Sequence, residues 1–151
     1  MIYFLLWTFC LYWIHVLSHL IKNKSHAHHH RNFDENAIPS KWSWKNFFIW
    51  VDDWQSTKDQ WITEVIPTFI FSLFTGQWWI LGLYWAWSAF VQEIIEHNNK
   101  INLYPFLTSG VWHCYHHKDD KCNYGLFFPL WDIIFRTNHG VARTKPEAKT
   151  N

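Results

Sequence analysis

The first 21 residues constrain the fold of this chain more than any other segment. Between Met1 and Ile21 there is no Asp, Glu, Lys or Arg. A helix of that length rises about 31 Å, which matches the thickness of the hydrocarbon core of a bilayer. A cleaved signal peptide is the alternative, but a basic start and an A-x-A cleavage site are both absent. We therefore expect a membrane-spanning helix.

The basic residues after this segment predict its orientation. Lys22, Lys24 and Arg31 follow the apolar run, and basic residues beside a span tend to stay on the cytoplasmic side. We therefore expect the N-terminus to face outward and the residues after the span to lie at the cytoplasmic face.

Two later segments also predict contact with a membrane. Residues 65–92 contain no charged side chain, but one helix of this length would reach about 42 Å, which exceeds the apolar slab. Gly76-Gln77 interrupts the run, so we expect a helical hairpin that turns there, with a short first arm over about 63–75. Residues 32–61 mix aromatic side chains with Lys and Asp, which predicts an interfacial helix in the headgroup layer. A soluble amphipathic core helix is the alternative.

Composition excludes several classes of function. The formal net charge is +1 and the basic residues form no long run, which argues against a nucleic-acid partner. No two of the three cysteines form a C-x-x-C pair, and three cysteines are too few for a disulfide framework. Aromatic residues make up 21% and charged residues only 17% of the chain, so water is not expected to be its only solvent. The length suits one domain.

The eleven histidines predict the chemistry. His15 and His19 are four residues apart and so share one face of the first helix. An H-x-x-H-H triplet occurs twice, and on a helix this spacing puts three imidazoles on one flank. The last two diverge by about 100°, so that one triplet can serve two metal ions. The triplets are His26, His29 and His30, and His113, His116 and His117.

Simpler interpretations exist for each triplet. The first could be a surface tract that binds metals loosely, with His28 as a spare. The second could be a structural zinc site completed by Cys114 or Cys122. Two identical triplets and a pair exceed what one tetrahedral zinc ion can use, so we expect a multinuclear centre. Imidazole suits Zn, Cu, Fe and Ni, and the ligand type alone does not name the metal.

His97 stands at the end of the second apolar run, with Glu93 four residues earlier on the same helical face. A lone histidine there is often a helix cap. The predicted hairpin returns His97 to the face that holds the other histidines, so we expect it to be a ligand. For Glu93, three roles stay open: a ligand, a carboxylate that orients a ligating histidine, or a solvated group at the helix end.

These motifs resemble the fatty acid hydroxylase/sterol desaturase superfamily of integral-membrane di-iron oxygenases. The segments YWIHVLSH at 12–19, HAHHH at 26–30 and WHCYHH at 112–117 resemble its three histidine boxes. Asn123-Tyr124-Gly125 and PLWDIIFRT at 129–137 look like its characteristic ending. The resemblance covers roughly 9–137.

The resemblance implies an all-α membrane helical bundle with a cytoplasmic histidine-rich cap. Its spanning helix is followed by an interfacial helix and a helical hairpin, and all lie in one domain over 1–137. The polar tail, 138–151, is expected to be disordered. Two non-haem iron ions, for which zinc could substitute, would be held by His15, His19, His26, His29, His30, His97, His113, His116 and His117.

The resemblance also implies an activity and partners. O2 would be used to hydroxylate or desaturate a long-chain lipid of fatty acyl, sterol or carotenoid type at an unactivated C–H bond, and hydroxylation is the favoured reaction. Electrons would come from a cytochrome b5-like or ferredoxin-like donor. Three residues near the third box would position it by hydrogen bonds: Asn123, Tyr124 and Asp132. His28 and His139 match no box position, and we expect both to face solvent.

Two departures from the family pattern are visible. Many relatives have a further histidine where this chain has Glu93, which bears on the number of ligands. Relatives also commonly have more membrane helices before the first box. The resemblance therefore implies a compact or shortened version, which we expect to self-associate to seal its substrate channel.

Two other classes of protein would also collect histidines. A non-enzymatic membrane protein that binds or transports metal would need polar residues along a path at mid-depth, and the hairpin offers only Ser72, Gln77 and Ser88. A membrane cytochrome would use paired histidines as axial ligands, but needs only two per haem, and no C-x-x-C-H attachment motif is present.

Overall fold

The computed structural model describes residues 1–33 and 42–139. These residues form helices and turns, with one isolated bridge between Asn102 and Gly110 and no β-strand. The predicted all-α class is confirmed for this part of the chain. Apart from residues 138 and 139, the tail predicted to be disordered lies outside the described residues.

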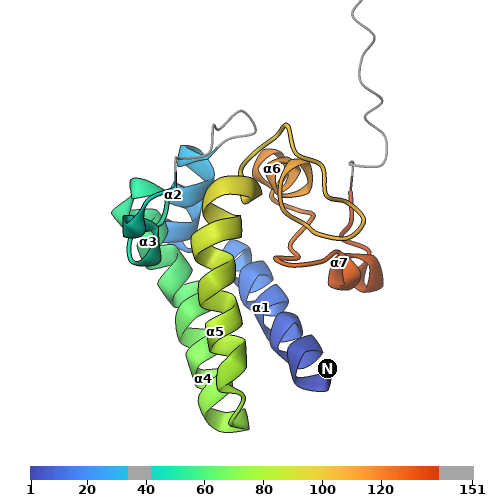
Figure 1. Ribbon diagram of the computed structural model, residues 1–151. Helices are drawn as coiled ribbons and strands as arrows, with labels where there is room; N and C mark the ends of the chain where they lie inside the picture. Colours follow the sequence, from blue (N-terminus) through green and yellow to red (C-terminus); the bar gives the residue numbers. More distant parts are fainter. Residues whose placement is uncertain (34–41, 140–151) are drawn as a thin grey trace, which may run out of the picture.

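The elements follow one another as a long helix, a cap segment, a hairpin and a second cap segment (Figure 1). A short break follows the first helix, and longer connections precede and follow α6. The elements are α1 (Ile2–Leu20), α2 (Lys24–Asn32), η1 (Trp44–Phe47), η2 (Trp50–Asp52), α3 (Trp54–Gln60), η3 (Trp61–Val65), α4 (Ile66–Thr75), α5 (Trp78–Trp87), η4 (Ser88–Glu96), α6 (Val111–Lys118) and α7 (Leu130–Phe135).

Helix α1 coincides with the predicted span. It is long and apolar enough to cross a membrane, by length and composition. The predicted hairpin is also present, because α4 ends at Gly76 in the left-handed conformation, with φ 70°. The first arm is longer than expected, since α3, η3 and α4 follow one another without a break from Trp54 to Thr75.

The single helix expected over 32–61 is divided into short segments. Within the described residues of this range after α2, the helical residues belong to η1, η2, α3 and the start of η3. Polar side chains start two new turns there. Ser43 and Asn46 form a capping box at η1, and Asp53 caps α3 by accepting a hydrogen bond from the Ser56 amide. Between them Val51 has a φ of 50°, which no continuous helix can contain.

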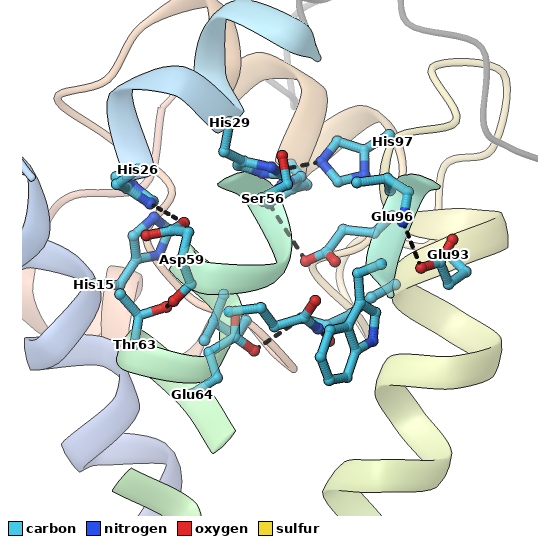
Figure 2. Close-up of a pocket in the computed structure, with 16 residues that line it drawn as sticks. His15, His26, His29, Ser56, Asp59, Thr63, Glu64, Glu93, Glu96 and His97 are labelled. Atoms are coloured by element: carbon cyan, nitrogen blue, oxygen red, sulfur yellow. Dashed lines mark hydrogen bonds and ion pairs between the residues drawn. The ribbon is translucent and has the colours of Figure 1, made fainter. Parts of the chain in front are cut away.

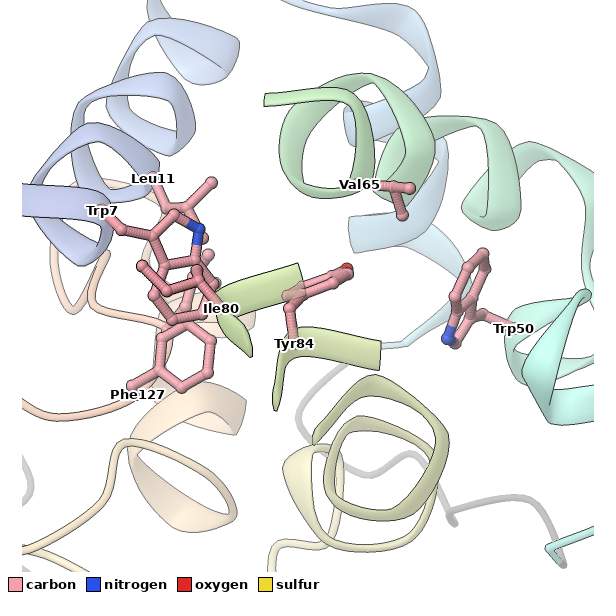
Figure 3. Packing of buried hydrophobic residues seen from close by; sticks show 8 residues of the cluster. Trp7, Leu11, Trp50, Val65, Ile80, Tyr84 and Phe127 are labelled. Carbon is pink, nitrogen blue, oxygen red and sulfur yellow. The ribbon is translucent and has the colours of Figure 1, made fainter. Parts of the chain in front are cut away.

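Aromatic side chains pack α1 against the hairpin (Figure 3). Trp7 and Ile80 are completely buried, and the ring centroids of Trp7 and of Tyr84 on α5 lie 6.3 Å apart. The Trp7 indole also donates a hydrogen bond of 2.9 Å to Thr68 Oγ1 on α4, so that its polar atom is satisfied inside the core. This packing places the end of α1 that carries His15 and His19 at the same end of the bundle as the end of η4.

The outward faces of these helices remain apolar. Phe74 at the hairpin tip is 85% exposed and Leu20 is 73% exposed, which is unusual for a folded chain in water alone. Figure 1 shows the N-terminus and the hairpin turn at one end of the bundle and α2, α3 and α6 at the other. Other exposed apolar residues on these helices are Leu6, Trp13, Ile62, Phe69, Leu73, Trp78 and Trp79.

Candidate metal centre

The nine histidines proposed as ligands converge at the end of the bundle capped by α2, α3 and α6. They fall into two clusters, and within each cluster the potential ligand atoms lie within 4.8 Å of one another. Stacked rings of His30 and His117, with centroids 4.2 Å apart, join the two clusters. The first cluster is His15, His19, His26, His30 and His116, and the second is His29, His97, His113 and His117.

Helical spacing explains how each cluster forms. The i, i+4 pair of α1 and the triplets of α2 and α6 each present imidazoles on one flank. Helix α6 is brought to the end of η4 by Gly110, whose amide donates a hydrogen bond of 3.0 Å to the Glu96 carbonyl. Gly110 has a φ of 81°, a conformation that favours glycine. His97 follows η4 directly and reaches the second cluster from there.

The distances between ring nitrogens suit metal ligands. In the first cluster, Nε2 of His19 lies 2.9 Å from Nε2 of His26 and 3.1 Å from Nε2 of His116. Around one ion with metal–nitrogen bonds of about 2.1 Å, two ligands lie about 3.0 Å apart at right angles and about 3.4 Å apart in a tetrahedron. The observed spacing fits such an arrangement without large movement of the rings.

The second cluster has the same spacing. Nε2 of His97 lies 3.3 Å from Nε2 of His29, and Nε2 of His117 lies 3.0 Å from Nε2 of His113. The ring centroids of His97 and His113 are 4.9 Å apart, which connects the two pairs. Four imidazoles from three different elements therefore surround one point.

Hydrogen bonds at Nδ1 fix the tautomers in the first cluster. His15 Nδ1 donates to the Tyr124 carbonyl at 2.8 Å and His116 Nδ1 to the Cys122 carbonyl at 2.6 Å. Because a carbonyl can only accept, Nε2 of each neutral ring carries a lone pair. Among the described residues, Nε2 of His15 and of His30 is buried without a hydrogen-bond partner. Such converging lone pairs repel one another unless a cation lies between them, so the donor set fits a metal.

Burial keeps these imidazoles neutral. Desolvation lowers the pKa of His97 to about 4. Desolvation and then the neighbouring histidines lower the pKa of His30 to about 2, and hold the pKa of His113 and His116 well below the ordinary histidine value. Neutral imidazole is the form that binds a metal, so the clusters are ready to bind at neutral pH.

A polar cavity of about 40 Å³ adjoins both clusters on the side of the helix bundle. Figure 2 shows His15, His26 and Asp59 along one side of it, with Glu96 and His97 on the other. The volume admits a molecule the size of water or dioxygen but not a lipid chain. Further polar lining comes from Ser56, Gln60, Thr63, Glu64, Gln92 and Glu93.

The residues expected to position the boxes lie around the clusters. Glu93 is buried, and its Oε1 accepts a hydrogen bond of 2.7 Å from the Val51 amide. Neither histidine cluster includes it. Asn123 Nδ2 donates to the Trp112 carbonyl of α6 at 3.3 Å. The Tyr124 carbonyl accepts a hydrogen bond from His15 Nδ1 of the first box, and the Tyr124 ring packs edge-on against His116 of the third box, with centroids 5.4 Å apart.

Asp132 does not contact a clustered histidine through these bonds, but it holds the turn whose Tyr124 carbonyl accepts the hydrogen bond from His15. Its carboxylate accepts hydrogen bonds of 2.8 Å from the amides of Tyr124 and Gly125. Outside the clusters, His139 is exposed. His28 is partly buried, and its Nε2 lies 3.2 Å from Asp53 Oδ2, so it is less open to solvent than expected.

Sequence reasoning missed two acidic residues beside the clusters. Asp59 Oδ2 accepts a hydrogen bond of 2.8 Å from His26 Nδ1, and Glu96 Oε1 lies 3.6 Å from His113 Nδ1. Glu96 could have been found from its place beside His97. Asp59 gives no signal of this kind, because it stands 33 residues after its partner in a segment with no histidine.

Comparisons with known proteins agree with the motifs. The sequence model of the family described as "Fatty acid hydroxylase" matches residues 1–137. Methylsterol monooxygenase 1 from Danio rerio is 34% identical over 64 residues, which is 37% of this chain and 22% of that protein. The matched part therefore spans about a fifth of that relative's length. No solved structure matches the chain.

Proposed function

Because the chain belongs to the fatty acid hydroxylase family, we propose that it is a membrane-bound oxygenase in which the nine clustered histidines hold two non-haem iron ions. The observation that carries the proposal is the convergence of these histidines into two clusters that adjoin each other. Nine neutral donors exceed what a structural zinc ion uses. Two adjacent clusters indicate a site for two ions.

The ions and the chain would have separate tasks. Bound iron, reduced by a partner, would supply the activation of O2 that an unactivated C–H bond requires. The chain would hold the ions through imidazole Nε2 atoms. The hydrogen bonds from Nδ1 of His15, His26 and His116 orient those rings. Burial of the rings and the small size of the adjoining cavity would keep bulk water away from the reacting atoms.

The substrate would be a long-chain lipid of fatty acyl, sterol or carotenoid type, which the enzyme hydroxylates or desaturates. The exposed apolar faces of α1, α4 and α5 support this part of the proposal, because a chain embedded in lipid meets such substrates in the bilayer. The name of the methylsterol monooxygenase relative also supports a lipid substrate.

The chain would cross the membrane more than once, through α1 and the α4–α5 hairpin, with the histidine clusters at the cytoplasmic face. The basic residues Lys22 and Lys24 after α1 support this orientation. An open groove leads to His19 and His117 and has Lys121 and Asp120 in its lining. We propose that a cytochrome b5-like or ferredoxin-like electron donor binds at this groove. Self-association of the chain would close the channel for the lipid.

Metal analysis tests the proposal. The full chain, purified in detergent, is expected to hold about two non-haem iron ions per chain. His116→Ala should lose metal because it removes a ligand from the first cluster. His28→Ala is the matched control, because His28 lies on α2 outside both clusters, and it should keep the wild-type metal content. Haem absorbance, or equal metal content in the two variants, would contradict the proposal.

Product analysis tests the reaction. Membranes that contain the chain and a suitable electron donor are incubated with fatty acyl, sterol or carotenoid lipids. We expect a product heavier by one oxygen atom, or lighter by two hydrogen atoms, with wild type and His28→Ala but not with His116→Ala. A metal-loaded protein that releases its metal into liposomes without forming either product would instead be a transporter.

A further inference from the structure

A carboxylate holds one histidine of the first cluster. Asp59 on α3 is 6% exposed, and its Oδ2 accepts a hydrogen bond of 2.8 Å from His26 Nδ1. The other ring nitrogen of His26 points into the cluster, where it lies 2.9 Å from His19 Nε2. The Nδ1 side of the His26 ring is therefore held by a buried carboxylate (Figure 2), while Nε2 faces the other imidazoles of the first cluster.

This contact differs from those of the other clustered histidines. His15 and His116 donate from Nδ1 to backbone carbonyls, which carry no charge. His113 lies 3.6 Å from its carboxylate, beyond hydrogen-bond distance. Among the histidines of the two clusters in the described part of the chain, only His26 has a carboxylate at hydrogen-bond distance.

The chemistry of this pair has a direct consequence for a bound ion. A carboxylate that accepts the Nδ1 proton fixes the tautomer, orients the ring and makes Nε2 a better donor. It also brings negative charge next to a centre whose histidine ligands are all neutral, and buried charges are stable only when they are compensated. The effect should fall on the cluster that contains His26 and leave the other cluster unchanged.

We propose that Asp59 is a positioning residue that sets the metal affinity of the first cluster through His26. The inference rests on the proposed metal centre and deepens it, because it makes the two ion sites unequal. A purely structural role for Asp59, in which it only joins α3 to α2, would change the stability of the fold without separating the two sites.

The chain contains a matched control for this contact. Asp53 and His28 form a similar pair between α3 and α2, with His28 Nε2 3.2 Å from Asp53 Oδ2, but His28 belongs to neither cluster. Asp53 also caps α3, and asparagine serves equally well as an N-cap. Asp59→Asn within α3 and Asp53→Asn at its N-cap therefore make the same chemical change, with and without a connection to a cluster.

The experiment measures ion affinity in the full chain in detergent, with Zn²⁺ against a competing chelator. The absorption of bound Co²⁺ reports the ligand environment. We expect Asp59→Asn to lower the affinity for one of the two ions by about 10- to 100-fold and to leave the affinity for the other ion at the wild-type value. Part of the Co²⁺ spectrum should shift. Asp53→Asn should keep both ions and the wild-type spectrum.

A double-mutant comparison separates an effect that passes through His26 from a general loss of stability. In a chain that already carries His26→Asn, the change Asp59→Asn should not lower the affinity for the ion of the first cluster any further, because Asp59 acts on that ion through His26. Additive losses, equal losses at both ions, or identical affinities in Asp59→Asn and Asp53→Asn would each overturn the inference. A wild-type chain that binds no metal would instead refute the proposed function.

Discussion

Replacing Asp132 by alanine should remove the support of the turn that holds His15. Asp132 is completely buried, and its carboxylate accepts hydrogen bonds of 2.8 Å from the Tyr124 amide, the Gly125 amide and the Thr137 hydroxyl. Alanine leaves these donors without their acceptor. The Thr137 hydroxyl keeps its contact with Tyr12, so the cost comes chiefly from the two backbone amides.

Each buried amide left without a partner costs about 1–3 kcal/mol, so Asp132→Ala should destabilise the fold by about 4 kcal/mol. For a chain of this size, 1 kcal/mol corresponds to about 2–4 °C in the unfolding midpoint. The thermal midpoint should therefore fall by about 8–16 °C. Metal affinity of the first cluster should fall as well, because the Tyr124 carbonyl bonds His15.

Thermal unfolding of the full chain in detergent measures the effect. Asp119→Ala is the control, because the Asp119 side chain accepts an exposed hydrogen bond from the Lys121 amide, and its midpoint should stay close to that of wild type. An Asp132→Ala midpoint within about 2 °C of this control would refute the reasoning, since at least two buried donors would then have found other partners.

Two further predictions concern backbone conformation and pH. Gly110→Ala should lower the unfolding midpoint strongly, because φ is 81° there and the added Cβ would overlap the Ile101 carbonyl oxygen. Gly82→Ala, whose Cβ meets nothing within 4 Å, should be neutral or stabilising, and equal midpoints would contradict the expected strain. The metal-free protein should also lose stability on acidification. Burial lowers the pKa of His97 to about 4, so below an unfolded-state pKa of about 6.5 the unfolded chain binds a proton that the folded chain does not. This histidine alone should lower the free energy of unfolding by about 2 kcal/mol at pH 5 relative to pH 7. A thermal unfolding midpoint that stays constant from pH 7 to pH 5 would contradict the predicted loss.

The sequence predicted those parts of the fold that depend on local pattern. The uncharged run of α1 and the break at Gly76 are properties of neighbouring residues, and they determine the long apolar helix and the hairpin. The H-x-x-H-H spacing likewise places imidazoles on one flank of α2 and α6 whatever packs around them. The convergence of the clusters follows from these elements once the hairpin returns His97 to the cap.

The rest depended on contacts between distant residues. Aromatic content over 32–61 indicated one interfacial helix, but the caps at Ser43 and Asp53 start separate turns instead. Caps of this kind are single side chains whose competing hydrogen bonds a hydrophobic pattern does not record. Asp59 was missed for a related reason. Its role comes from the packing of α3 on α2, and no sequence spacing announces a partner 33 residues away.

An experimental structure of the metal-loaded chain, with anomalous scattering at the iron edge, tests the proposed di-iron centre most directly. We expect two iron peaks, one inside each histidine cluster. One peak should be bound by Nε2 atoms of the first cluster, His26 and His116 among them, and the other by the cluster that contains His97. A single peak, or ions bound outside the two clusters, would contradict it.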